Sequence, residues 1–168
     1  MLGDPRTDPE AAFEEAAIAG IRSRLDRRAG AGLRYDIIQP FGLDTIVLIR
    51  SGERLELRLL EFKAYAGQRM GGVGFGNQRG RGPQVDLLML PDDVLASLTP
   101  YVRWCFADLT RLEDERRYSV ITCWEAKRAA MGGVGRGKQN NFRIKDALHE
   151  PLAWGEMLDR VEGFLARD

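Results

Sequence analysis

A carboxylate and an ammonium stand two residues apart near the end of a predicted strand. Residues 54–63 (RLELRLLEFK) alternate in a pattern that predicts a β-strand. Because side chains of a strand alternate between its two faces, Glu61 and Lys63 share a face with three leucines. These leucines, expected to point into the core, are Leu55, Leu57 and Leu59. Charged groups that interrupt such a face are costly to bury without a purpose, which makes Glu61 and Lys63 the first candidates for chemistry.

Two further carboxylates are expected to approach this pair. Residues 44–50 (DTIVLIR) predict a strand joined by a short turn to the strand that carries Glu61. In an antiparallel meander the start of one strand lies beside the end of the next, so Asp44 is placed near Glu61. Glu14 lies at the border of the apolar stripe of a helix predicted before the strands, and that helix would pack against the sheet.

Carboxylates grouped in this way suit a hard metal ion. Two or three of them can hold one or two Mg²⁺ ions through oxygen ligands, and Mn²⁺ is an alternative. Such an ion can activate a water molecule and stabilise the charge that develops on a phosphodiester. We therefore expect Glu14, Asp44 and Glu61 to be metal ligands, with Lys63 positioning the attacking water. A strand-end ion pair for Glu61 and Lys63, and Asp36 in place of Asp44, are the competing interpretations.

The elements that must position these groups form one α/β domain with a mixed sheet. Apolar spacing predicts a first helix, and β-branched runs predict the strands that follow. The order is helix, three strands, helix, two strands and a C-terminal helix. In chain order the predicted segments are 8–28, 33–39, 44–50, 54–63, 84–98 with a break at Pro91, 101–109, 117–124 and 154–167, with a short strand at 142–144.

Glu14, Asp44, Glu61-Phe62-Lys63 and a glutamine at the next helix, Gln84, together resemble a known family. Their order over residues 10 to 125 is similar to the PD-(D/E)XK nucleases, which have the restriction-endonuclease-like fold. The resemblance implies an αβββαβ core and Mg²⁺-dependent hydrolysis of DNA. It also implies catalytic roles for Asp44, Glu61, Lys63 and Gln84.

Two segments rich in glycine and positive charge are candidates for gripping a polyanion. Residues 63–82 and 126–145 contain ten Lys or Arg residues, no acidic residue and 11 of the 19 glycines. Glycine lets backbone amides approach a phosphate closely, and arginine binds phosphate with two donors. The residues expected to contact phosphates are Arg69, Arg79, Arg81, Arg128, Arg136 and Lys138.

The same two segments also support an alternative, non-catalytic function. Residues 70–78 match residues 131–139 at seven of nine positions, and each segment follows a Glu-x-Lys. A binding module for nucleic acid or nucleotide phosphates could use two such loops without catalysis. Residues 132–138 fit the first seven positions of a P-loop, but Gln139 stands where serine or threonine should hold magnesium.

Composition limits the remaining possibilities. The 168 residues carry 25 positive and 25 negative side chains, so bulk charge does not make this a nucleic-acid-coating protein. Two cysteines and one histidine argue against a disulfide framework, a zinc site or a serine-type triad. A polar N-terminus predicts no signal peptide, and we expect a cytoplasmic protein without membrane contact. DNA is the expected partner, with RNA as an open alternative, and the small size favours a homodimer or a structure-selective substrate.

Overall fold

The computed structural model describes residues 8–30, 32–39, 45–67, 74–75, 85–86, 90–131 and 144–166. These residues form the helices and strands of an α/β protein. The elements are α1 (Pro9–Arg28), β1 (Leu33–Ile38), β2 (Thr45–Ser51), β3 (Arg54–Tyr65), β4 (Gly74–Phe75), β5 (Val85–Asp86), α2 (Asp92–Leu98), β6 (Val102–Asp108), the 3₁₀ helix η3 (Glu113–Glu115), β7 (Arg117–Ile121), α3 (Cys123–Met131), α4 (Ile144–Ala147) and α5 (Trp154–Leu165).

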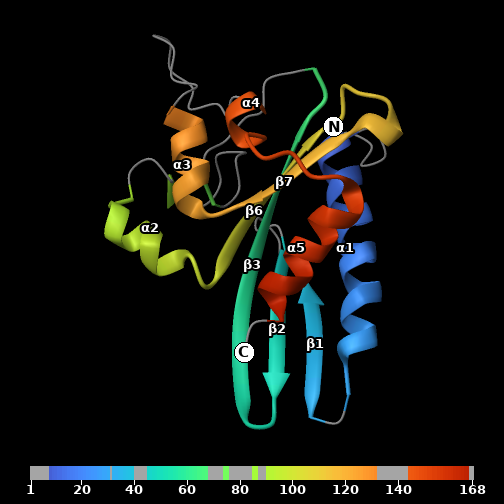
Figure 1. The fold of residues 1–168 in the computed structure, drawn as a ribbon. Helices are drawn as coiled ribbons and strands as arrows, with labels where there is room; N and C mark the ends of the chain where they lie inside the picture. The colour runs from blue at the N-terminus through green and yellow to red at the C-terminus, as the bar shows by residue number, and fades with distance from the viewer. Residues whose placement is uncertain are drawn as a thin grey trace, which may run out of the picture.

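The main sheet has five strands in the order β1-β2-β3-β6-β7 (Figure 1). β1, β2 and β3 form an antiparallel meander, β6 lies parallel to β3, and β7 returns antiparallel to β6. β4 and β5 pair separately as a two-stranded ribbon. The mixed sheet confirms the predicted α/β class. The αβββαβ arrangement is present as α1-β1-β2-β3-α2-β6, with the separate β4–β5 ribbon inserted between β3 and α2.

The first helix begins where its sequence predicts. Asp8 caps it by accepting a hydrogen bond from the Glu10 backbone N–H at 3.0 Å, and Pro9 occupies the first turn. Its buried stripe packs on the sheet and on α5, where Arg24 and Arg28 pair with Glu162. Among the described residues, no helix is long and apolar enough to cross a membrane.

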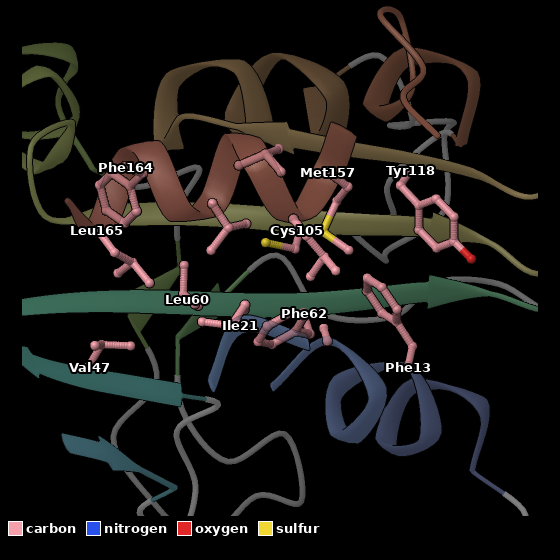
Figure 2. Packing of buried hydrophobic residues seen from close by; sticks show 14 of the residues in the cluster. Phe13, Ile21, Val47, Leu60, Phe62, Cys105, Tyr118, Met157, Phe164 and Leu165 are labelled. Carbon is pink, nitrogen blue, oxygen red and sulfur yellow. The ribbon is translucent and has the colours of Figure 1, made fainter. Parts of the chain in front are cut away.

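Each face of the sheet carries its own hydrophobic cluster. Figure 2 shows the first cluster, in which residues such as Phe13 of α1 and Met157 of α5 meet Phe62 and Cys105 of the sheet. The second cluster lies on the opposite face, where α2, α3 and α4 cover Trp104, among others. Adjacent residues of β6 therefore face different clusters, as the two-residue period of a strand requires.

The leucine face of β3 was predicted wrongly. Leu55 and Leu57 are 63% and 47% exposed, and only Leu59 packs against the second cluster. The residues that face the first cluster are Leu60 and Phe62, on the other side of the strand. The second cluster is built by β6, β7 and the helices beside them, and its contacts on β3 begin at Leu59.

Three other segments differ from the predicted secondary structure. Residues 123–131 form helix α3, where the prediction ended a strand at 124 and placed a basic loop from 126. Val85 and Asp86 form β5 rather than the start of a helix, although the predicted restart at Asp92 is confirmed. Ile144 begins α4 instead of ending a strand. In each case a short apolar run fits helix and strand equally well, and tertiary packing decides between them.

Candidate active site

Glu61 and Lys63 form a buried ion pair in the second half of β3. Lys63 Nζ lies 3.3 Å from Glu61 Oε1. The Lys63 side chain is 3% exposed and the Glu61 side chain is 5% exposed. The two residues pair in register with Trp104 and Phe106 of β6, both of them completely buried. In such apolar surroundings the attraction between the two charges is stronger than at the surface, but the free-energy cost of removing them from water is also larger.

The edge of β3 opposite β6 is where other groups reach this pair. β2 begins at Thr45, which is paired with Leu60, so the described part of β2 stops short of residues 61–65. Glu10 of α1 occupies this edge: its Oε1 lies 3.1 Å from Lys63 Nζ, and its Oε2 accepts from the Ala64 backbone N–H at 3.4 Å. Lys63 thus connects a strand carboxylate with a helix carboxylate.

A third carboxylate, Glu14, lies one helical turn further along α1. Its Oε1 accepts hydrogen bonds from Thr45 Oγ1 at 2.9 Å and from Gln39 Nε2 at 3.2 Å. Thr45 is 1% exposed and immediately follows Asp44 in the chain. Glu14 therefore ties α1 to the start of β2, the strand that Asp44 precedes.

These donors fit a hard divalent ion in chemistry, although the described residues do not complete a site. Glu10, Glu14 and Glu61 offer carboxylate oxygens, which are the ligands that Mg²⁺ prefers. Within the described ranges, no group of three or more His, Cys, Asp or Glu side chains is placed to hold a metal ion. Asp44, the remaining predicted ligand, lies outside those ranges. Glu14 and Glu61 as ligands remain predictions.

The negative charge of Glu61 acts on Cys123, the first residue of α3. The pKa of the Cys123 thiol is raised to about 11, mainly because the thiol is buried. A hydrogen bond with Trp104 and the charge of Arg103 oppose this rise, and the Glu61 carboxylate adds a smaller contribution to it. Cys123 is therefore a protonated, unreactive thiol at neutral pH, and it packs as a small apolar side chain.

The other predicted site residues are only partly placed. Arg128 is exposed, as a phosphate contact requires, but it lies in the last turn of α3 rather than in a loop. Asp36, the alternative to Asp44, lies on β1 and pairs with Arg50 of β2 at 3.1 Å, so β2 separates it from β3. The predicted residues outside the described ranges are Asp44, Arg69, Arg79, Arg81, Gln84, Arg136 and Lys138. The P-loop-like residues 132–138 are outside them as well.

Glu10 is the site residue that sequence reasoning missed. In the sequence alone, Glu10 is a first-turn acid of the kind that interacts favourably with the positive end of the helix dipole. The missed signal was its spacing: Glu10 and Glu14 are four residues apart, so a helix places both carboxylates on one face. That face borders the buried stripe, which is how both side chains reach the edge of the sheet.

Comparison with known proteins adds no identification, since no family model, curated protein or solved structure was found to match this chain. The site itself offers a cation, Lys63, that is shielded from water and held between two carboxylates. Such a group can donate hydrogen bonds to an anion or to an attacking water molecule, and the carboxylates around it can hold a metal ion.

Proposed function

We propose that this protein is a metal-dependent endonuclease that hydrolyses DNA phosphodiester bonds. The observation that carries the proposal is the buried Lys63–Glu61 pair, at 3.3 Å, on the part of β3 that α1 approaches with Glu10 and Glu14. The αβββαβ order supports it, because that order is what the resemblance to PD-(D/E)XK nucleases implies.

Each residue has a distinct part in the proposed reaction. Glu61 and Asp44, with Glu14 as a third ligand, would hold Mg²⁺ or Mn²⁺ through oxygen atoms. When bound, the ion would lower the pKa of a water molecule and would stabilise the negative charge that develops on the phosphodiester. Lys63 would orient the attacking water by donating a hydrogen bond, and Glu10 would hold the Lys63 ammonium at the strand edge. Gln84 is the further residue that the family resemblance assigns to the same site.

The rest of the molecule would bind the DNA backbone. Exposed Arg128 would contact phosphates, together with the arginines and the lysine of the two basic glycine-rich segments. We include a cytoplasmic location in the proposal. It is supported by Cys105 and Cys123, both of which are buried as thiols, as is usual in a reducing compartment.

The decisive experiment compares cleavage by variants of the two Glu-x-Lys segments. Supercoiled and linear DNA are incubated with wild type, with Glu61→Gln and with Glu125→Gln, in Mg²⁺, in Mn²⁺ and in EDTA. We expect metal-dependent nicking by wild type and by Glu125→Gln. Glu61→Gln, which removes one proposed metal ligand, should lose at least about 100-fold in rate.

Circular dichroism confirms that each variant is folded before its activity is compared. Cleavage that survives in Glu61→Gln would refute the proposed site. No cleavage by wild type, with DNA retained equally by all three proteins, would favour the non-catalytic binding module. Binding of neither metal nor DNA would indicate a nuclease-like fold that serves as an interaction domain.

A further inference from the structure

A cavity of about 600 Å³ opens at the end of the sheet where β3 and β6 finish. Ala66 and Leu109, which directly follow these two strands, form part of its lining. Its volume lies in the range of small-molecule binding pockets. Pockets of α/β proteins commonly lie at the carboxyl ends of parallel strands, and β3 and β6 are the parallel pair of this sheet.

Three aromatic side chains line the cavity, and the half-buried one, Trp154, is the ring on which a base would stack. Phe13 and Tyr118 stack with ring centroids 5.9 Å apart, and Figure 2 shows the two side chains near each other at one end of the first cluster. Trp154 meets Tyr118 edge to face at 5.1 Å. Phe13 and Tyr118 are almost fully buried, whereas Trp154 is half-buried at the boundary between core and cavity.

Polar groups stand beside this aromatic lining. Arg116 and Glu113 both line the cavity, one offering donors and the other acceptors. Arg116 Nε is buried, and within the described part of the chain no hydrogen-bond partner is found for it. A buried donor without a partner costs free energy, so a ligand acceptor at this position would be stabilising. The pKa of the Tyr118 hydroxyl is raised, mainly by burial, although the Arg116 guanidinium, which hydrogen-bonds to this hydroxyl, opposes the rise. Within the described residues, only the Nε atom of Arg116 is therefore left for a ligand acceptor.

The cavity adjoins the candidate active site through two elements. Pro9, which lines it, directly precedes Glu10, and Ala66 lies three residues after Lys63 on the same strand end. Glu10 itself bonds to Lys63 and to the Ala64 backbone. A nucleotide whose phosphate contacted Lys63 would therefore have an aromatic cavity within reach of its base.

We infer that this cavity receives an unstacked base of the nucleic-acid substrate, so that the enzyme acts on single-stranded or locally unpaired DNA. The inference rests on the proposed function, because it names the substrate class of the same site. Stacking on aromatic rings suits any base, and an arginine beside the rings can hydrogen-bond to base edges.

The test measures binding without cleavage. A fluorescently labelled thymidine pentamer and a pentamer of abasic sugar-phosphate units, which carry equal charge, are titrated with protein in EDTA. Wild type should bind the thymidine pentamer about tenfold more tightly, the size expected for one base stacked on aromatic rings. Deoxyadenosine monophosphate is titrated in parallel and should bind much more weakly than the pentamer.

Variants separate the cavity from general charge attraction. Ala12 and Ala16 line the cavity from the exposed side of α1, so Ala12→Leu with Ala16→Leu fills it without opening the core. This double variant should lose the preference for bases while still binding the abasic pentamer. Ala19→Leu, at an exposed position of the same helix outside the cavity, is the matched control and should retain the preference. Trp154→Phe should reduce it partially.

Each outcome is decisive for the cavity independently of nuclease activity. Equal binding of both pentamers by wild type, or a base preference that persists in the filled variant, would overturn the inference. Binding of the mononucleotide as tightly as the pentamer would point to a free nucleotide as the ligand and would also overturn it. Metal-dependent cleavage without base preference would leave the proposed function intact, whereas base preference without cleavage would retain the cavity and refute the nuclease.

Discussion

Glu-x-Lys occurs twice in this chain, once on a strand and once on a helix, and the two copies make different contacts. On β3, Glu61 and Lys63 point to the same side and lie 3.3 Å apart. On α3, Glu125 bonds backward to Thr122, whose backbone N–H and hydroxyl donate to Glu125 Oε2 at 2.8 and 2.9 Å. Lys127 turns elsewhere and donates to Leu90 O at 2.9 Å and to Asp92 at 3.1 Å.

Backbone geometry explains the difference. Residues two apart lie on the same face of a strand, whereas on a helix they are separated by about 200°. The strand copy therefore forces its two charges together in a buried place, and the helix copy sends them to separate partners. Glu125 completes a capping box, a structural role, while Asp92, the partner of Lys127, is 68% exposed. The same three-residue pattern can thus carry chemistry on one element and only stability on another.

The largest expected effect is a difference in the free energy of unfolding between variants of the two lysines. Lys63→Met should destabilise the protein by about 3 kcal/mol, because Glu61 is left buried without its ammonium partner. Lys127→Met should cost less than about 1 kcal/mol, because its ion pair with Asp92 reaches solvent. Urea unfolding followed by circular dichroism measures both values.

A double variant sharpens this prediction. Lys63→Met combined with Glu61→Leu removes both buried charges and should recover much of the stability lost by Lys63→Met alone. Unfolding of Lys63→Met and Lys127→Met at the same urea concentration would contradict this prediction, since both ion pairs would then be equally solvated.

The next effect concerns the capping box of α3. Glu125→Ala removes the acceptor for the Thr122 backbone N–H and should cost about 1 kcal/mol in free energy of unfolding. Glu125→Gln keeps an acceptor oxygen at the same position and should cost less than half of that. Thermal unfolding of the two variants makes the comparison, and an equal loss in both would mean that the charge of Glu125, and not its hydrogen bond, stabilises α3.

This capping box also shows what the sequence could have told us and what it could not. Thr122 followed three residues later by Glu125 is a helix-start signal, and it favours α3 over the strand that β-branched neighbours suggested. The helix α1, the antiparallel meander and the existence of a strand at β6 were predictable, because their apolar periods and turn residues are clear. The parallel pairing of β6 with β3 was not predicted, because apolar period does not give strand direction. The exposure of Leu55 and Leu57 was not, because alternation identifies two faces without saying how far a covering layer extends.

The candidate site also has one contact that the sequence predicts and another that only tertiary packing determines. The proximity of Glu61 and Lys63 follows from strand period alone and was predicted correctly. The contact between Glu10 and Lys63 depends on where β2 begins and on the rotation of α1, both of which are set by tertiary packing. Local sequence contains the i, i+4 spacing of Glu10 and Glu14, but not the sheet edge that the two carboxylates meet.

The two Glu-x-Lys regions meet at Cys123, which gives a smaller, pH-dependent effect. The folded thiol has a pKa of about 11 against an ordinary value of 9.0, so it resists ionisation that the unfolded chain allows. Stability from this group is fully present below pH 9 and is lost as the pH rises toward 11. At pH 10 wild type should have lost about 1 kcal/mol more than Cys123→Ala, measured relative to pH 8 by urea unfolding. Parallel pH profiles for the two proteins would contradict this assignment.

The smallest expected effect is that of the Glu61 charge on β3 on the pKa of Cys123 at the start of α3. Burial is the main cause of the raised pKa of Cys123, and the Glu61 carboxylate adds to it. Glu61→Gln should therefore lower the pKa of the thiol without returning it to the ordinary value, whereas Glu125→Gln serves as the matched neutralisation on α3 itself. The pH dependence of Cys123 alkylation in a Cys105→Ala background measures both shifts. If the thiol ionised at the same pH with and without Glu61, the prediction would be wrong. The positive charge of Lys63 would then neutralise the effect of the Glu61 carboxylate on Cys123.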